Sequence, residues 1–169
     1  SARLPSVLSA ILCISILFHF LKTLYDTKLA LLGSIILMSS LEFASLSRFS
    51  ITDMTLATLI SSSIISFFLG YHQIITSHRF FKFQIVEFSY WYILAFVFFS
   101  LAFLTIVPVA VILVGLILFP FFWWIGKLEY FFNNLSFWLG LVLFIVLTVP
   151  WYLAVHFATS GEFSKIFFG

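Results

Sequence analysis

The residues best placed to do chemistry lie in one short polar turn between two apolar segments. Arg48 and Asp53 are five residues apart in this turn, which covers residues 47–54. A carboxylate at a membrane surface can orient a polar acceptor or a metal ion, and an arginine can pair with a phosphate. The same pattern also fits a structural role, because Thr52 or Asp53 can cap the next helix and Arg48 can anchor in lipid headgroups.

Three further polar residues are weaker candidates for a site. Glu42 lies toward the outer end of the second apolar segment, and a carboxylate within a span is a functional hypothesis by default. It can also be solvated there, or paired with Arg48. His156 follows the last apolar segment and lies near Glu162, but one histidine and one carboxylate do not make a metal site. The sequence leaves open whether a divalent metal or any other cofactor binds.

The composition indicates that these residues are positioned by a membrane protein. Of 169 residues, 63% are hydrophobic and 8% are charged, and the mean hydropathy is +1.23. A soluble domain carries about 25% charged residues, so this chain cannot cover a surface that faces water. The net charge of +2, without a basic stripe, argues against nucleic acid as a partner. The single cysteine, Cys13, excludes an internal disulfide.

The apolar segments predict an all-α fold, a polytopic transmembrane bundle of about six spanning helices. A helix needs about 20 apolar residues to cross a bilayer, and lipid requires each span to satisfy its own backbone amides. Pro108 separates the fourth and fifth segments, which are otherwise almost continuous. The predicted spans are Pro5 to Tyr25, Leu29 to Leu46, Met54 to Ile75, Phe88 to Leu104, Val109 to Ile125 and Leu135 to Pro150.

The positive charges predict how this bundle is oriented. The loops on one side carry Lys22, Lys28, Arg79, Lys82 and Lys127, and the other side carries Arg3, Arg48 and Lys165. The more positive side is expected to face the cytoplasm. Both ends of the sequence, the turn at 48–53 and the turn at 105–108 then face outward. Because the sequence starts at a serine and stops after an aromatic run, we expect it to be part of a longer protein.

Four short motifs occur in an order and at a spacing that resemble one family of membrane enzymes. They are Arg3-Leu4-Pro5-Ser6, Arg48 with Thr52-Asp53-Met54, Thr105-x-x-Pro108-Val109-Ala110, and Pro150-Trp151-Tyr152 followed by Gly161, Phe163 and Phe167-Phe168. Together they resemble bacterial GT-C glycosyltransferases, the group that includes protein O-mannosyltransferases and lipid A aminoarabinose transferase. The resemblance covers nearly the whole chain.

The resemblance implies an enzyme of the bacterial inner membrane. Such enzymes move a sugar from a polyprenyl-phosphate carrier to an acceptor on the outer face, here lipid A, lipopolysaccharide or another molecule. Asp53 would match the family's second acidic position, and Arg48 would support that turn or meet the carrier phosphate. Residues 1–169 would be a transmembrane core fragment without the first outer loop, which holds the catalytic acid, and without the C-terminal region. We expect this fragment to be inactive alone.

Two alternatives to a catalytic core stay open. Ile106 and Val107 replace the family's Lys-Gly, which removes a cation that could face the phosphate. This change favours a non-catalytic membrane subunit or a degenerate remnant. A transporter fragment is the second alternative, and it depends on Glu42 and on the serines at positions 61, 62, 63 and 66. Those serines are also typical of close helix packing.

Overall fold

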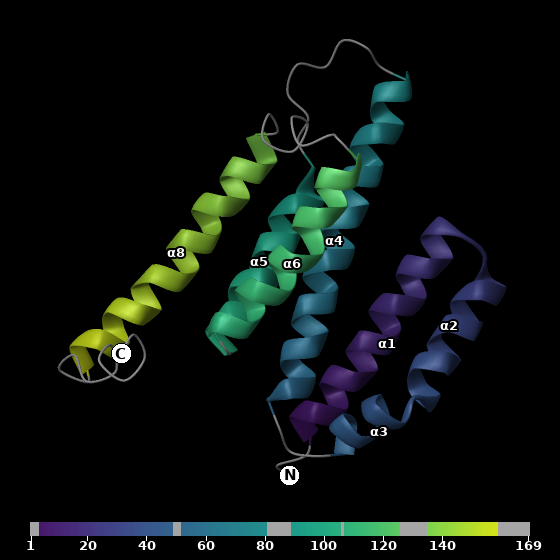
Figure 1. Cartoon of the computed structure of the whole chain (residues 1–169), viewed down its shortest axis with the longest axis horizontal. Helices are drawn as coiled ribbons and strands as arrows, with labels where there is room; N and C mark the ends of the chain where they lie inside the picture. The colour runs from purple at the N-terminus through teal and green to yellow at the C-terminus, as the bar shows by residue number, and fades with distance from the viewer. Residues whose placement is uncertain (1–3, 49–51, 81–88, 106, 126–134, 159–169) are drawn as a thin grey trace.

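The protein is a bundle of α-helices (Figure 1). The structure, a computed structural model, describes residues 4–48, 52–80, 89–105, 107–125 and 135–158. Within these ranges every regular element is a helix and none is a strand. The helices are α1 Leu4–Leu24, α2 Thr27–Ser39, α3 Leu41–Arg48, α4 Asp53–Phe80, α5 Tyr90–Thr105, α6 Val107–Ile125 and α8 Leu135–Ala158.

The predicted all-α polytopic fold is confirmed, since each of the six predicted apolar segments is mostly helical in its described residues. Three of the helices are long and apolar enough to cross a membrane, over Leu4–Leu24, Asp53–Gln73 and Leu135–Ala154. Three shorter apolar stretches, Thr27–Ser39, Tyr90–Thr105 and Ile112–Phe121, match the other predicted spans. The chain is therefore a multi-pass membrane protein.

The second predicted span, Leu29 to Leu46, is not one helix. It breaks at Ser40, which has extended backbone angles (φ −66°, ψ 131°) and separates α2 from α3. The hydroxyls of Ser39 and Ser40 donate to the carbonyls of Ile36 and Leu37, over 3.0 and 2.9 Å. Serines that bond to nearby carbonyls compete with the helical pattern, which accounts for the break.

The last predicted span does not stop at Pro150. Helix α8 continues through this proline to Ala158, so the predicted end of the span at Pro150 is wrong. Proline removes one amide donor, but leaving the helix in lipid would expose several more unpaired backbone groups. Pro108 behaves as predicted, because α5 ends at Thr105 and Pro108 lies in the first turn of α6.

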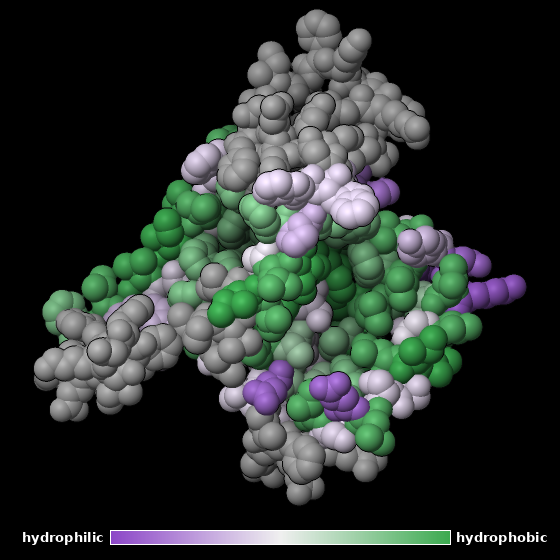
Figure 2. All heavy atoms as spheres, in the orientation of Figure 1, coloured by the Kyte–Doolittle hydropathy of each residue, from purple (hydrophilic) through white to green (hydrophobic). Residues whose placement is uncertain are grey.

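Helices α4 and α5 form the centre of the bundle. Helix α1 packs on α4, α8 packs on α5, and α6 contacts both central helices. Helix α2 lies outside α1, at the edge of the bundle (Figure 1). Figure 2 shows that apolar side chains cover the sides of the molecule, while hydrophilic side chains gather toward its ends. This distribution is expected for a protein that lies in a bilayer.

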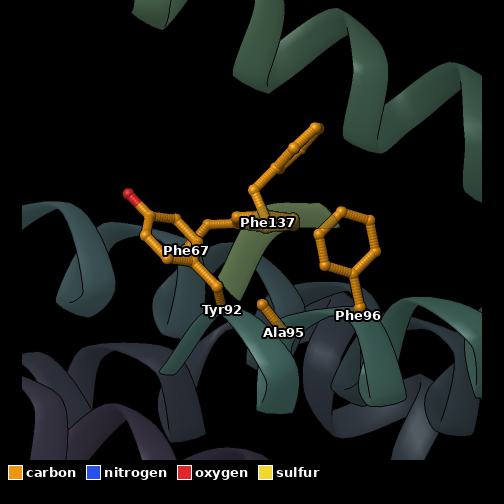
Figure 3. Packing of buried hydrophobic residues seen from close by; sticks show 5 residues of the cluster. All are labelled: Phe67, Tyr92, Ala95, Phe96 and Phe137. Atoms are coloured by element: carbon orange, nitrogen blue, oxygen red, sulfur yellow. The ribbon is translucent and has the colours of Figure 1, made fainter. Parts of the chain in front are cut away.

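Aromatic rings fill the core between α4, α5 and α8. Phe67, Tyr92, Phe96 and Phe137 are buried together with Ala95 (Figure 3). Phe96 packs edge-on against Phe67 and Phe137, with ring centroids 5.3 and 5.4 Å apart. Such tilted contacts are the favourable geometry for aromatic pairs.

The serines of α4 are used in packing. The Ser62 hydroxyl donates to the Thr58 carbonyl of its own helix over 2.6 Å. The Ser63 hydroxyl donates across the interface to the Ala95 carbonyl of α5 over 3.0 Å. Both serines are buried, and their small size lets the two helices approach closely.

Candidate functional site

The fold brings the sequence-predicted polar turn to one end of the bundle. Helix α3 and the first residues of α1 and α4 lie together at the lower end in Figure 1. Arg48 is the last residue of α3 and Asp53 is the first of α4. The side chain of Arg48 lies outside the part of the chain that the structure describes, so its pairing with a phosphate stays a prediction.

Asp53 opens α4 and is exposed. The amide of Leu56 donates to the Thr52 carbonyl over 2.9 Å, so Thr52 takes the capping position that the sequence predicted. Among the described residues, no hydrogen bond or ion pair engages the Asp53 carboxylate. The first turn of a helix stabilises a negative charge. Asp53 is therefore an exposed carboxylate at the first residue of α4.

Glu42 lies at the same end of the bundle, but in a helix that was not predicted from the sequence. It lies in the first turn of α3, after the break at Ser40, and not inside a spanning helix. Its side chain is exposed. The described residues contain no group of three or more histidine, cysteine, aspartate and glutamate side chains that could hold a metal ion. Glu42 and Asp53 are two exposed carboxylates at this end of the bundle.

A set of hydroxyls lies directly beneath Asp53, between α1 and α4. The hydroxyls of Ser9 and Thr55 are 3.2 Å apart. The Thr58 hydroxyl lies 3.0 Å from the Ser9 carbonyl and 2.8 Å from the Met54 carbonyl, so it can donate to either. We call Ser9, Thr55 and Thr58 the hydroxyl seam. It joins the first two turns of α4 to the second turn of α1.

Sequence reasoning missed the hydroxyl seam. The signal was present, because Ser6, Ser9 and Cys13 recur at helical spacing on α1, and Thr55 and Thr58 recur on α4. However, no local sequence pattern indicates that these two helix faces, which lie 46 residues apart in the sequence, are in contact.

The remaining predicted site residues do not join this group in the structure. His156 was expected to follow the last span, but it lies within α8, two residues before the helix ends. The correction has the same cause as at Pro150, since the helix does not stop there. The side chain of His156 and the whole of Glu162 are outside the described residues, so a site formed by this pair stays a prediction.

No protein-family model and no curated protein match the sequence. Among solved structures, the chain is similar to ArnT from Cupriavidus metallidurans in the apo state. The TM-score is 0.80 and the sequence identity is 24%. The match covers 98% of this chain and 29% of that one.

This similarity concerns the fold. ArnT is a lipid A aminoarabinose transferase of the GT-C class, the group that the four sequence motifs resemble. The predicted fold is thereby confirmed over almost the whole chain, which spans less than a third of the length of ArnT. The described helices therefore share their arrangement with part of the ArnT structure.

Proposed function

We propose that this chain forms part of the membrane core of a GT-C glycosyltransferase. The enzyme would move a sugar from a polyprenyl-phosphate carrier to lipid A, lipopolysaccharide or another acceptor on the outer face of the bacterial inner membrane. The observation that carries this proposal is the similarity of fold to ArnT over 98% of the chain. The four motifs point independently to the same group of enzymes.

The two charged residues of the polar turn would have separate roles in this reaction. In an inverting transfer, an acceptor oxygen or nitrogen forms a bond to the anomeric carbon as the carbon–oxygen bond to the carrier phosphate breaks. The phosphate leaves with the electron pair, and a carboxylate takes the acceptor's proton. The exposed Asp53 is suited to orient the acceptor or to assist this proton transfer. Arg48 would hold the negative charge that develops on the phosphate.

The experiment that tests the proposal is Asp53→Asn in the complete protein in its own membranes. We expect transfer to fall by at least about 100-fold, the lower range for loss of acid–base assistance, with unchanged protein level. The matched control is Asp26→Asn. Asp26 caps α2 by accepting from the Thr27 amide over 2.7 Å, and asparagine caps a helix equally well. Wild-type transfer by the Asp53 variant would remove this residue from the mechanism.

A non-catalytic subunit is the second candidate function. It is favoured by Ile106 and Val107, which stand where the family has Lys-Gly. Val107 is the first residue of α6. Restoring Lys-Gly at these two positions separates the candidates. Higher transfer after the exchange would indicate a weakened enzyme, and no transfer in either form would indicate a subunit.

The transporter alternative loses the features on which it depended. Glu42 lies in a short separate helix, and Ser62 and Ser63 direct their hydroxyls to backbone carbonyls in packed interfaces. Transporters commonly place polar groups and broken helices near the middle of the membrane. Glu42 lies toward one end of the bundle, and the hydroxyls of Ser62 and Ser63, although near the middle of the span Asp53–Gln73, are used in helix packing.

A further inference from the structure

The start of α4 packs on α1 and also on α5 and α6, because Leu56 is buried beside Ala102 and Val114. Met54, next to Asp53, is 1% exposed, and Leu56 is 7% exposed. Among the described residues, the polar contacts of this region with α1 are those of the hydroxyl seam, in which Thr55 contacts the hydroxyl of Ser9 and Thr58 contacts the carbonyl of Ser9. The three residues of the hydroxyl seam therefore join one helix to the other just below Asp53.

Hydroxyl contacts of this kind fix the register of two helices more strictly than apolar contacts do. A hydrogen bond weakens steeply when its length or direction changes, whereas apolar contacts tolerate small sliding. Helices α1 and α4 begin at the same end of the bundle, so sliding would change the height of Asp53 relative to the start of α1 (Figure 1). A displacement of about 1 Å at a reacting group can reduce a rate by about 100-fold.

We propose that Ser9, Thr55 and Thr58 are positioning residues, which hold the Asp53 carboxylate at the height that the transfer reaction requires. The proposal rests on the function proposed above, and it adds residues that do not touch the substrate. The seam acts through α4, because Thr55 and Thr58 lie two and five residues beyond Asp53 on the same rigid helix.

The chain offers a matched control for this proposal. Thr58 and Ser63 lie on the same helix, both are buried, and each approaches a carbonyl of a neighbouring helix at 3.0 Å. Thr58 reaches α1 beneath Asp53, whereas Ser63 reaches α5 more than a turn further along. Thr58→Val and Ser63→Ala each remove one such hydroxyl. A purely structural role predicts similar effects of the two changes, while a positioning role predicts different ones.

The first test is kinetic and uses the complete protein. For Thr58→Val we expect kcat to fall about tenfold with KM nearly unchanged, since the seam sets the geometry of reaction and not substrate binding. Thr58→Ser, which keeps the hydroxyl, should restore most of kcat. Ser63→Ala should leave kcat within about twofold. Equal losses in Thr58→Val and Ser63→Ala, or no rescue by serine, would overturn the proposal.

The second test does not depend on catalysis. Spin labels are placed at the exposed positions Leu4 and Thr52, with Cys13 replaced by serine, in the complete protein in lipid nanodiscs. Thr58→Val should broaden the measured distance distribution, and Ser63→Ala should not. An unchanged distribution in Thr58→Val would contradict the inference. If Asp53→Asn stays active while the distribution broadens, the proposed function fails and the seam's hold on α4 stands.

Discussion

Two interfaces in this bundle are built from different chemistry. Helix α1 is joined to α4 near the candidate site by hydroxyls, with contacts of 3.0 to 3.2 Å. Helix α8 is joined to α5 by rings, among them Phe99 and Phe144, which stack at 5.0 Å. Lipid gives no hydrophobic driving force for either contact, so both depend on packing and on direct bonds. We therefore expect the α1–α4 contact to matter most for the position of Asp53 and the α5–α8 contact to matter most for stability.

The largest expected effect is that of an added side chain that clashes with a ring in the α5–α8 interface. A Cβ added at Gly140 would lie 2.9 Å from Phe96 Cγ, whereas one at Gly115 of α6 would meet nothing within 4 Å. Gly140→Val should therefore lower the free energy of unfolding by about 3 kcal/mol. Gly115→Val should change it by less than about 1 kcal/mol. Unfolding in detergent, followed by tryptophan fluorescence, measures both, and equal effects would contradict the packing described here.

A smaller effect is expected when one aromatic ring is replaced by an aliphatic side chain of similar size. Phe144 contacts Phe99 and Phe103, with the second pair of centroids 5.3 Å apart. Each aromatic pair is worth about 0.5–1.5 kcal/mol beyond burial. Phe144→Leu should therefore cost about 1–2 kcal/mol of unfolding free energy and leave transfer activity nearly unchanged per folded molecule. A loss of activity without a loss of stability would show that this interface also sets the site.

The smallest expected effect on stability is that of the hydroxyl seam. Hydrogen bonds between membrane helices average about 0.6 kcal/mol, so Thr58→Val should cost less than about 1 kcal/mol in the same unfolding assay. Its effect on kcat should nevertheless exceed that of Phe144→Leu. The two variants should therefore rank in opposite orders in the stability assay and in the activity assay. The same order in both assays would contradict the proposed difference between the two interfaces.

Much of the fold could be predicted from the sequence because lipid constrains it so strongly. Apolar runs of spanning length locate the helices, and Pro108 locates the boundary between α5 and α6. The break at Ser40 could not be predicted from hydropathy, since two serines barely lower the mean in that segment. The continuation of α8 through Pro150 depends on the cost of unpaired amides in lipid, which sequence reasoning underestimated.

The candidate site was only partly predictable, for a different physical reason. Asp53 at the start of α4 follows from local capping and from the motif that surrounds it. The position of Glu42 depends on the break before it, and the hydroxyl seam depends on contact between segments distant in sequence. One sequence carries no direct signal for such tertiary contacts.

Transfer at the outer face requires that the Asp53 turn faces the outside of the membrane. Single cysteines at Thr52 and at Tyr25, which are exposed at opposite ends of the bundle, test this directly. Cys13 is replaced by serine in both variants, and intact cells are treated with a maleimide that does not cross the membrane. We expect labelling at position 52 and none at position 25 until the membrane is permeabilised. The reverse pattern would place Asp53 on the cytoplasmic side and contradict transfer at the outer face.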